Sequence, residues 1–240
     1  MWKSLLALVV WAWSPTLALA LDLSVTEKQW LQAALPVLRY AQQQQIPLDV
    51  VVQPQPTPGA TPLGMAVVQG RCKLVLSMRN NPQVEATLGQ VPTDLMQPVI
   101  ELIAAHELGH CRRSLAGAWM KMPAGFLAAE AHAESLAENK ALQNEAPFPL
   151  LTEDAEQRAE RREEAYGDLV GLAWIAQHHP TAYARVYAWL MASRSATSTQ
   201  GSSHDTLQWL KLAAQREAFA HGSLFEAASA LWMLGLTQNP

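Results

Sequence analysis

Residues 104–111 read AAHELGHC, and the two histidines of this stretch, His106 and His110, lie four positions apart. On a helix, positions i and i+4 share a face, so both imidazoles would point in the same direction. Glu107 follows the first histidine directly. This pattern can hold one zinc ion between the histidines and place a general base beside it. The alternative is an amphipathic helix that carries two histidines on its polar face.

The residues before the motif predict that it lies on a helix. Pro98 suits the first turn of a helix. Val99, Ile103, His106 and His110 then recur at helical spacing on one face. We therefore expect a helix that begins near residue 98 and directs both histidines to the same side.

A catalytic zinc site needs a third protein ligand, because three side chains hold the ion and one position stays open. Residues 161–171 read RREEAYGDLVG and place Glu164 and Asp168 four positions apart, on one helix face. We expect Glu164 to bind the metal and Asp168, which enters an apolar run, to accept a hydrogen bond from a ligand histidine. The alternative is a solvated charged face. Glu160 or Glu163 could replace the expected ligand, but neither lies four residues before the aspartate.

The first 20 residues, MWKSLLALVVWAWSPTLALA, have the features of a secretory signal peptide. Lys3 supplies a positive start, residues 5–13 form a short apolar run, and residues 18–20 fit a small-x-small cleavage site. The apolar run is short for a bilayer span, which disfavours an uncleaved anchor. We therefore expect a mature protein of residues 21–240 with no transmembrane segment, exported across the inner membrane to a bacterial periplasm.

Cys72 and Cys111 are the only cysteines, and an oxidising compartment would allow them to form one disulfide. Cys72 opens a strand-like run and Cys111 follows His110, so a bridge would tie that strand to the helix of the motif. Cysteine as a fourth zinc ligand is the alternative. On a helix, adjacent residues face about 100° apart, so we favour the disulfide.

The remaining pattern predicts an α+β fold that is predominantly helical. Residues 25–45 have helical spacing, and nearly everything after residue 94 is helical and rich in alanine and leucine. Short strands, which we expect to pair as an antiparallel meander, are predicted at residues 48–53, 64–69 and 72–78. We expect one domain with a small antiparallel sheet beside the helix of the motif.

Composition narrows the classes of partner. The chain has 240 residues, of which 50% are hydrophobic and 16% charged, so it can form one sizeable core. The net charge is −4, and no run of lysine and arginine with interleaved aromatic residues occurs. We therefore expect no nucleic-acid partner. The sequence does not predict an oligomeric state.

The segment His106-Glu107-Leu108-Gly109-His110, followed some fifty residues later by Glu164-x-x-x-Asp168, resembles the gluzincin zinc metallopeptidases of the HtpX and CAAX-prenyl-protease type. Soluble periplasmic members, such as BepA and LoiP, are similar in layout. The resemblance covers about residues 64–215. It implies a zincin-like metallopeptidase fold with one Zn²⁺ per chain, held by His106, His110 and Glu164.

The resemblance also implies two features outside the ligand set. The strand at residues 72–78 stands where the family has the sheet edge that receives extended substrate. Residues 202–205 read SSHD where the family has Ser/Thr-x-His-Pro, so His204 would have a catalytic role at the metal site or the oxyanion. Asp205 departs from the proline of the family, and the alternative for His204 is an exposed loop histidine.

The expected function is that of an exported zinc endopeptidase acting on extended or misfolded proteins. Glu107 would take a proton from the water that zinc activates and pass it to the leaving amine. One alternative is a catalytically silent chaperone or assembly factor with structural zinc, which the intact Glu107 disfavours. Another is a helical interaction module with an accidental motif, which would bind no metal.

Overall fold

The computed structural model describes residues 23–55, 61–123, 126, 155–197 and 202–238, and the expected signal peptide lies outside these ranges. The described part is α+β and predominantly helical, as predicted. Its elements, in chain order, are α1 (Val25–Gln43), β1 (Leu48–Val52), β2 (Leu63–Val68), β3 (Arg71–Leu76), α2 (Pro82–Leu88), η1 (Thr93–Leu95), α3 (Met96–Leu115), α5 (Ala155–His178), α6 (Tyr183–Thr197), α7 (Leu207–Leu212), η2 (Arg216–Phe219) and α8 (Leu224–Gln238).

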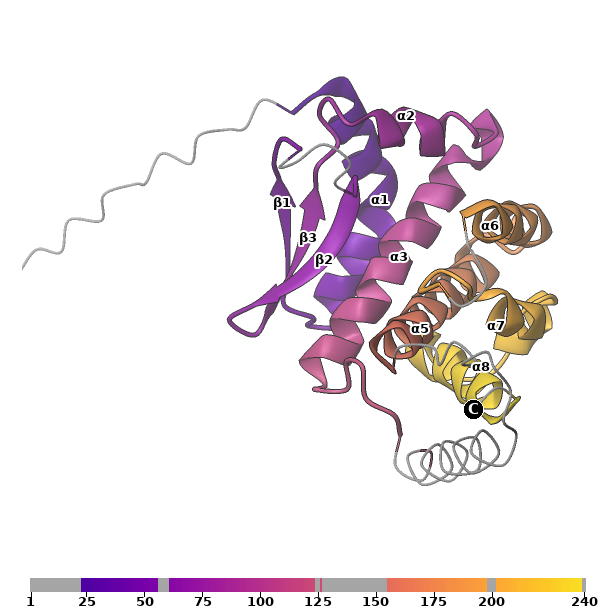
Figure 1. Ribbon diagram of the computed structural model, residues 1–240. Coiled ribbons are helices and arrows are strands. Elements are labelled where there is room, and N and C mark those ends of the chain that lie inside the picture. Colours follow the sequence, from indigo (N-terminus) through magenta and orange to yellow (C-terminus); the bar gives the residue numbers. More distant parts are fainter. Residues whose placement is uncertain (1–22, 56–60, 124–125, 127–154, 198–201, 239–240) are drawn as a thin grey trace, which may run out of the picture.

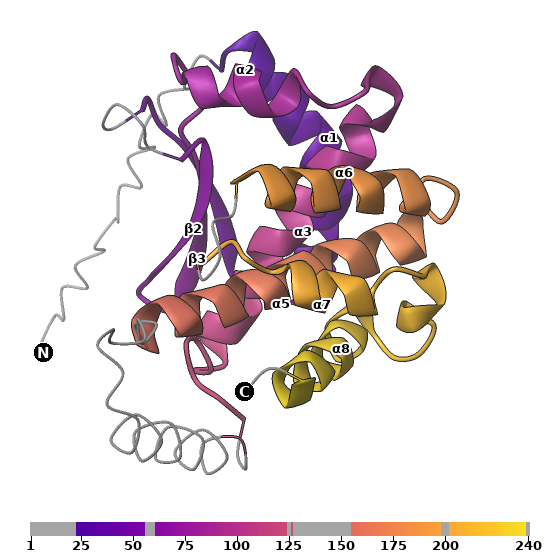
Figure 2. The same cartoon turned by 45° about the vertical axis from the view of Figure 1, so that its right-hand side comes forward.

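Helix α3 lies at the centre of the molecule, between the sheet and the C-terminal helices (Figure 1). It contacts α1, β2 and β3 on one side and packs along α5 on the other. Helices α6 and α8 both contact α5, and they lie above and below it in Figure 2. No helix in the described ranges is long and apolar enough to cross a membrane.

The sheet is mixed, so the predicted antiparallel meander is wrong. Strands β2 and β3 do form an antiparallel hairpin, and its turn at residues 69–70 has φ of 52° and 72°, as type I′ turns require. Strand β1, however, pairs with β3 in parallel, which gives the order β1-β3-β2. Val52 and Leu63 both lie opposite Leu76, so the long connection over residues 53–62 crosses the end of β3 instead of making a tight hairpin.

The strand order also corrects the expected substrate edge. The segment at residues 72–78 falls largely in β3, which is the central strand and is paired on both sides. Strand β2 is an edge of the sheet, and it contacts α3. The edge next to the helix of the motif is therefore formed by residues 63–68.

The disulfide between Cys72 and Cys111 is confirmed. Both cysteines are fully buried, and they join the start of β3 to α3 across 39 positions of sequence. Cys111 is therefore unavailable as a metal ligand. The bond fixes the sheet against α3 one residue beyond His110.

Candidate metal centre

The structure brings together the three predicted metal ligands. His106 and His110 come from α3 and Glu164 comes from α5, and one ligand atom of each lies within 4.8 Å of the others. The Nε2 atoms of the two histidines are 2.8 Å apart. Oε2 of Glu164 is 3.6 Å from Nε2 of His106, and its Oε1 is 3.4 Å from Nε2 of His110.

These separations fit a single tetrahedral ion. Ligand atoms about 2.0–2.2 Å from such an ion lie roughly 3.3–3.5 Å from one another. The two separations from Glu164 are close to this value, although they involve different oxygens, Oε2 toward His106 and Oε1 toward His110. The histidine pair needs to open by only about half an ångström to match it. The group could therefore bind a metal ion through two nitrogens and one carboxylate.

Asp168 holds the first histidine in place. Nδ1 of His106 donates a hydrogen bond of 3.0 Å to Oδ1 of Asp168, which leaves Nε2 directed at the metal position. Thr206 donates to Oδ2 of the same carboxylate at 2.6 Å. Asp168 is fully buried, so its charge requires partners of this kind. The arrangement is the one that fixes the tautomer of a metal-binding histidine.

Arg194 is a member of the centre that sequence reasoning missed. It lies on α6 and donates from Nε to Oδ2 of Asp168 at 2.9 Å and from Nη2 to Oδ1 at 2.6 Å. Its Nη2 also lies 3.3 Å from Oε2 of Glu164. One signal was present in the sequence, because Arg194 is the lone formal charge between Arg185 and Asp205.

The electrostatics of the metal-free centre follow from these contacts. Burial favours the neutral carboxyl of Asp168, but the charge of Arg194 and the hydrogen bond from His106 hold its pKa well below the usual range. Burial also opposes ionisation of Glu164, yet both ligand histidines lower its pKa to about 2. Burial lowers the pKa of His106, whereas the two carboxylates raise it, and the net shift is upward. The centre therefore attracts cations, including protons.

Close helix packing shapes the centre. A Cβ atom on Gly167 of α5 would lie 2.8 Å from Cε1 and Nδ1 of His106, so the imidazole rests on the bare backbone. A Cβ atom on Gly109 would lie 3.1 Å from Cγ2 of Val170. Gly109 therefore allows close packing where α3 crosses α5.

The two alternative ligands on α5 lie elsewhere. Glu163 is buried and accepts hydrogen bonds from Nε and Nη2 of Arg113 at 2.6 and 2.7 Å. Its Oε1 also accepts from the backbone N–H of Met120, which fixes the segment after α3. Glu160 is exposed. Of the three glutamates, Glu164 alone reaches the histidines.

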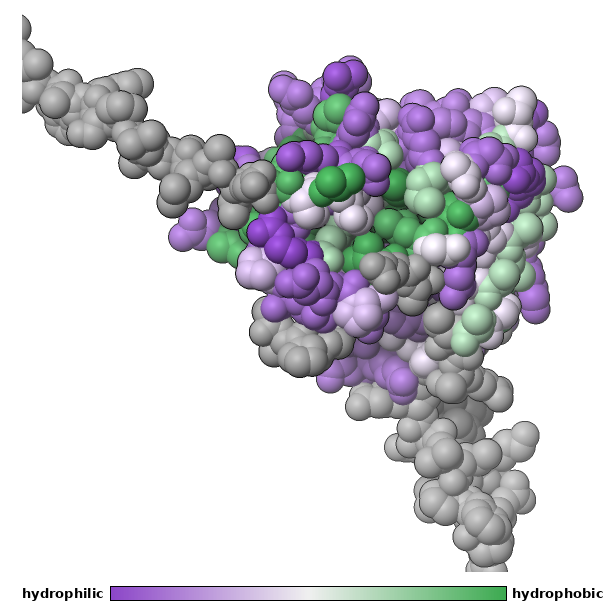
Figure 3. Space-filling model, turned by 90° about the horizontal axis from the view of Figure 1, so that it is seen from above, coloured by the Kyte–Doolittle hydropathy of each residue, from purple (hydrophilic) through white to green (hydrophobic). Residues whose placement is uncertain are grey.

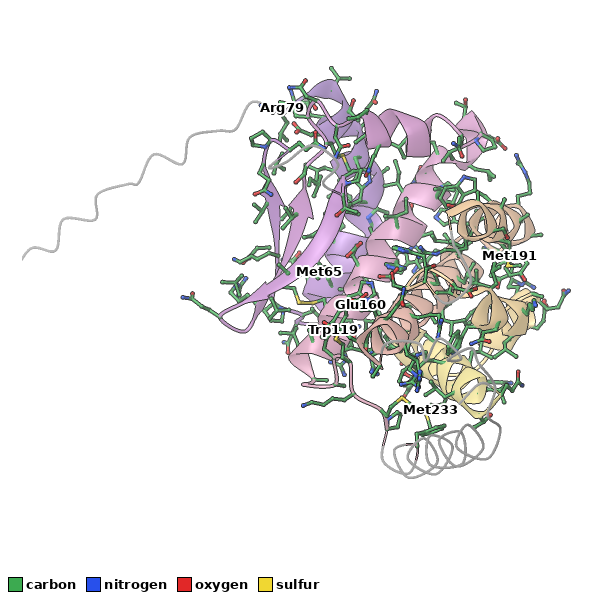
Figure 4. The ribbon with its side chains drawn as sticks, viewed as in Figure 1. Met65, Arg79, Trp119, Glu160, Met191 and Met233 are labelled. Carbon is green, nitrogen blue, oxygen red and sulfur yellow. A yellow bond between two sulfur atoms is a disulfide. The ribbon has the colours of Figure 1, made fainter. Side chains whose placement is uncertain are left out.

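Glu107 and the metal centre line one groove of about 810 Å³. Glu107 is half-buried on α3. Met65 of β2 and Trp119 beyond α3 line the same groove, and both are labelled in Figure 4. The ring of Trp119 packs edge-on against His110, with centroids 5.2 Å apart. The glutamate expected to act as a base thus faces the same space as the metal ligands.

Hydrophobic side chains form most of the groove wall. Viewed from above the orientation of Figure 1, hydrophobic residues gather in a hollow of the surface and hydrophilic residues surround it (Figure 3). Among the residues that the structure describes, every ionisable side chain that lines the groove belongs to the centre or lies beside it. The apolar lining includes Leu63, Met78, Ile103, Trp189 and Leu190.

His204 lies beside the centre without belonging to the group of three. Its Nε2 is 3.6 Å from Oε2 of Glu164, and it lines the groove. Its side chain is 52% exposed, which agrees with a loop histidine. His204 is therefore an exposed loop residue that faces Glu164, and its catalytic role stays a prediction.

Comparison with protein-family models, curated proteins and solved structures found no match for this chain. A function for the protein is therefore inferred from the geometry of the centre and the groove.

Proposed function

We propose that this protein is an exported zinc endopeptidase that hydrolyses peptide bonds of extended or misfolded proteins. The observation that carries the proposal is the convergence of His106, His110 and Glu164 in a groove that Glu107 also lines. Two histidines and one carboxylate are a ligand set of catalytic zinc, and a set of three leaves one position open. A purely structural zinc site has no need of a free carboxylate beside it.

Bound zinc would supply Lewis-acid polarisation of the scissile carbonyl and would lower the pKa of the attacking water. Glu107 would take the proton from this water and deliver it to the leaving amine. Asp168 would keep His106 in the tautomer that presents Nε2 to the metal. His204, exposed at the groove, would donate a hydrogen bond to the oxygen on which charge develops.

Strand β2 would bind the substrate backbone by strand addition. The N–H of Ser77 donates to the carbonyl of Pro62, and hydrogen-bonded pairs alternate along an antiparallel ladder. The backbone groups of Leu63, Met65 and Val67 therefore point away from β3. These same residues line the groove. An extended chain could pair with them, whereas a folded protein could not present its backbone in this way.

The groove wall favours apolar substrate segments. Away from the centre, the described residues of the wall include no charged side chain that could pair with a charge on the substrate. Burying an unpaired charge there would cost several kcal/mol, of the order seen for ions in protein interiors. Apolar segments are mostly buried in folded proteins and become accessible when proteins unfold. This selectivity supports a role in the quality control of exported proteins.

The disulfide supports the exported setting. Bonds of this kind persist in oxidising compartments, and Cys72 and Cys111 are paired in the protein interior. Together with the signal peptide expected at residues 1–20, this favours the bacterial periplasm as the site of action.

The substitution Glu107→Gln tests the proposal. We expect the variant to bind about one zinc per chain, as the wild type does, and to cleave an unfolded labelled protein about 10²- to 10⁴-fold more slowly. Elemental analysis and a gel-based cleavage assay give the two readouts. Glu160→Gln is the matched control, since this glutamate is exposed and lies outside the ligand group.

Two results would count against the proposal. If the folded wild type binds no metal, the motif is only a helix with two histidines on one face. A zinc-loaded wild type that prevents aggregation of unfolded proteins without cleaving them, and does so equally with Glu107→Gln, would establish the silent chaperone instead.

A further inference from the structure

Arg194 connects the groove wall to the metal centre. Helix α6 supplies Trp189, Leu190 and Ser193 to the groove, and Arg194 follows directly on the same helix. Its side chain is only 13% exposed. A guanidinium this deep requires anionic partners, and both of its partners come from α5.

The two partners are the ligand carboxylate and the carboxylate that orients His106. Nε and Nη2 of Arg194 form a two-bond fork onto Asp168. Nη2 also reaches Oε2 of Glu164 at 3.3 Å. Without this cation, two carboxylates four residues apart on α5 would repel each other in a partly buried site. Arg194 therefore sets the relative positions of both acidic groups.

The contact with Glu164 distinguishes its two oxygens. Arg194 contacts Oε2, which also lies 3.6 Å from Nε2 of His106, whereas Oε1 faces His110 at the shorter distance of 3.4 Å. A guanidinium that holds one oxygen of a carboxylate fixes the orientation of the group and favours the other oxygen as the metal ligand. A carboxylate free to rotate can offer both oxygens and fill two coordination positions.

We propose that Arg194 is a positioning residue of the metal centre, which holds Oε2 of Glu164 so that this ligand binds through Oε1 alone and one coordination position stays open. The inference deepens the proposed function and rests on its metal site, but it does not depend on peptidase activity. Lysine could not replace the arginine, because one ammonium lacks the planar fork that serves two carboxylates at once.

Cobalt(II) substitution of the full chain tests the proposal, because the visible absorption of this ion reports coordination number. We expect the wild type to bind about one Co²⁺ with the intense bands of a four-coordinate site. We expect Arg194→Gln and Arg194→Lys to lose about half of that intensity at equal metal content, and to bind Co²⁺ about 10- to 100-fold more weakly.

Arg185→Gln is the matched control. Arg185 lies on the same helix, its ion pair with Asp94 is exposed, and neither residue lines the groove. We expect this variant to keep the wild-type cobalt spectrum and metal affinity. If Arg194 only formed a structural ion pair, replacing it would leave the cobalt spectrum unchanged, as in the control. If Arg194 positions the ligand, replacing it changes the spectrum.

An unchanged cobalt spectrum in a folded Arg194→Gln chain that binds one Co²⁺ would overturn the proposal. If neither arginine variant folds, X-ray absorption of the zinc-loaded wild type decides. Four atoms around zinc, with one carboxylate oxygen, support the proposal, and five atoms with two carboxylate oxygens overturn it. A wild type that binds no metal would instead defeat the proposed function, so the two failures are distinguishable.

Discussion

Gly167 allows a sharp test of the metal centre, because the imidazole of His106 rests directly on its backbone. A Cβ atom at this position would lie 2.8 Å from Cε1 and Nδ1 of His106 and 2.9 Å from Nε2. Ordinary contacts with a Cβ atom begin near 3.4 Å, so Gly167→Ala must displace the ring by about 0.6 Å or more. Distances from a metal to its ligands tolerate only about 0.2 Å. The ring also cannot shift freely, since Asp168 holds its Nδ1.

The expected changes in stability and in zinc affinity can be told apart by their size. Alanine in place of a helical glycine stabilises an exposed helix by about 1 kcal/mol, and overpacking a tight site costs about 1–3 kcal/mol. The free energy of unfolding of metal-free Gly167→Ala should therefore fall by no more than about 2 kcal/mol. Zinc affinity should fall about 10- to 100-fold, because the histidine leaves its productive position.

Chelator competition measures the affinity, and thermal melting with and without zinc measures the stability. Gly171→Ala is the matched control, one turn further along α5, where a Cβ atom would meet the backbone oxygen of Leu102 at 2.8 Å. This variant should lose stability and keep its zinc affinity. The reasoning is refuted if Gly167→Ala binds zinc as tightly as the wild type, or if Gly171→Ala weakens binding equally.

Three further changes test the centre and its support. Asp168→Asn should weaken zinc binding about 10- to 100-fold. It should also lower the free energy of unfolding by about 3–5 kcal/mol in a denaturant titration, because Arg194 loses its main anionic partner, and a loss under about 1 kcal/mol would contradict this. The pKa of His106 is raised, so protons should displace zinc as the pH falls through that pKa, and the metal-free protein should become less stable as the pH rises through it. Zinc affinity that does not change with pH would disprove the effect. Replacing Cys72 and Cys111 by serine should lower the free energy of unfolding by about 4 kcal/mol in the same titration, as the separation of 39 residues implies. A change near zero would show that the disulfide does not stabilise the fold.

The group of side chains that could bind a metal could be predicted from the sequence, because each half of the group is encoded locally. His106 and His110 share a face of one helix, and Glu164 and Asp168 share a face of another, so each pair is specified by a spacing of four. The meeting of the two helices was suggested by chemistry, since a metal needs three ligands and a buried carboxylate needs a partner. The disulfide followed from a single pair of cysteines.

Other parts of the centre depend on tertiary packing that no local spacing encodes. Arg194 and Thr206 reach Asp168 from α6 and from the residue before α7, and the sequence does not say how these segments lie against α5. No feature of the sequence marks Gly167 as the residue whose backbone packs against the ring of His106. Each of these residues owes its role to a particular neighbour on another segment of the chain, which only the tertiary structure brings beside it.

The sequence predicted the three strands of the sheet, but it did not predict how they pair. Alternation of side chains identifies a strand and its buried face, whereas it does not identify the neighbouring strand. The connection over residues 53–62 is long enough either to turn back or to cross over, and it crosses. Parallel pairing of β1 with β3 then moved the edge of the sheet to β2.

The covalent bond between β3 and α3 has a consequence for how this groove can change. Cys72 anchors the central strand to α3, and β2 is held beside the same helix by the hairpin and by its own contacts with α3. Strand β1 lies on the other side of β3, and none of its residues lines the groove. Altered residues on β1 can therefore accumulate while the spacing between β2 and His110 is preserved.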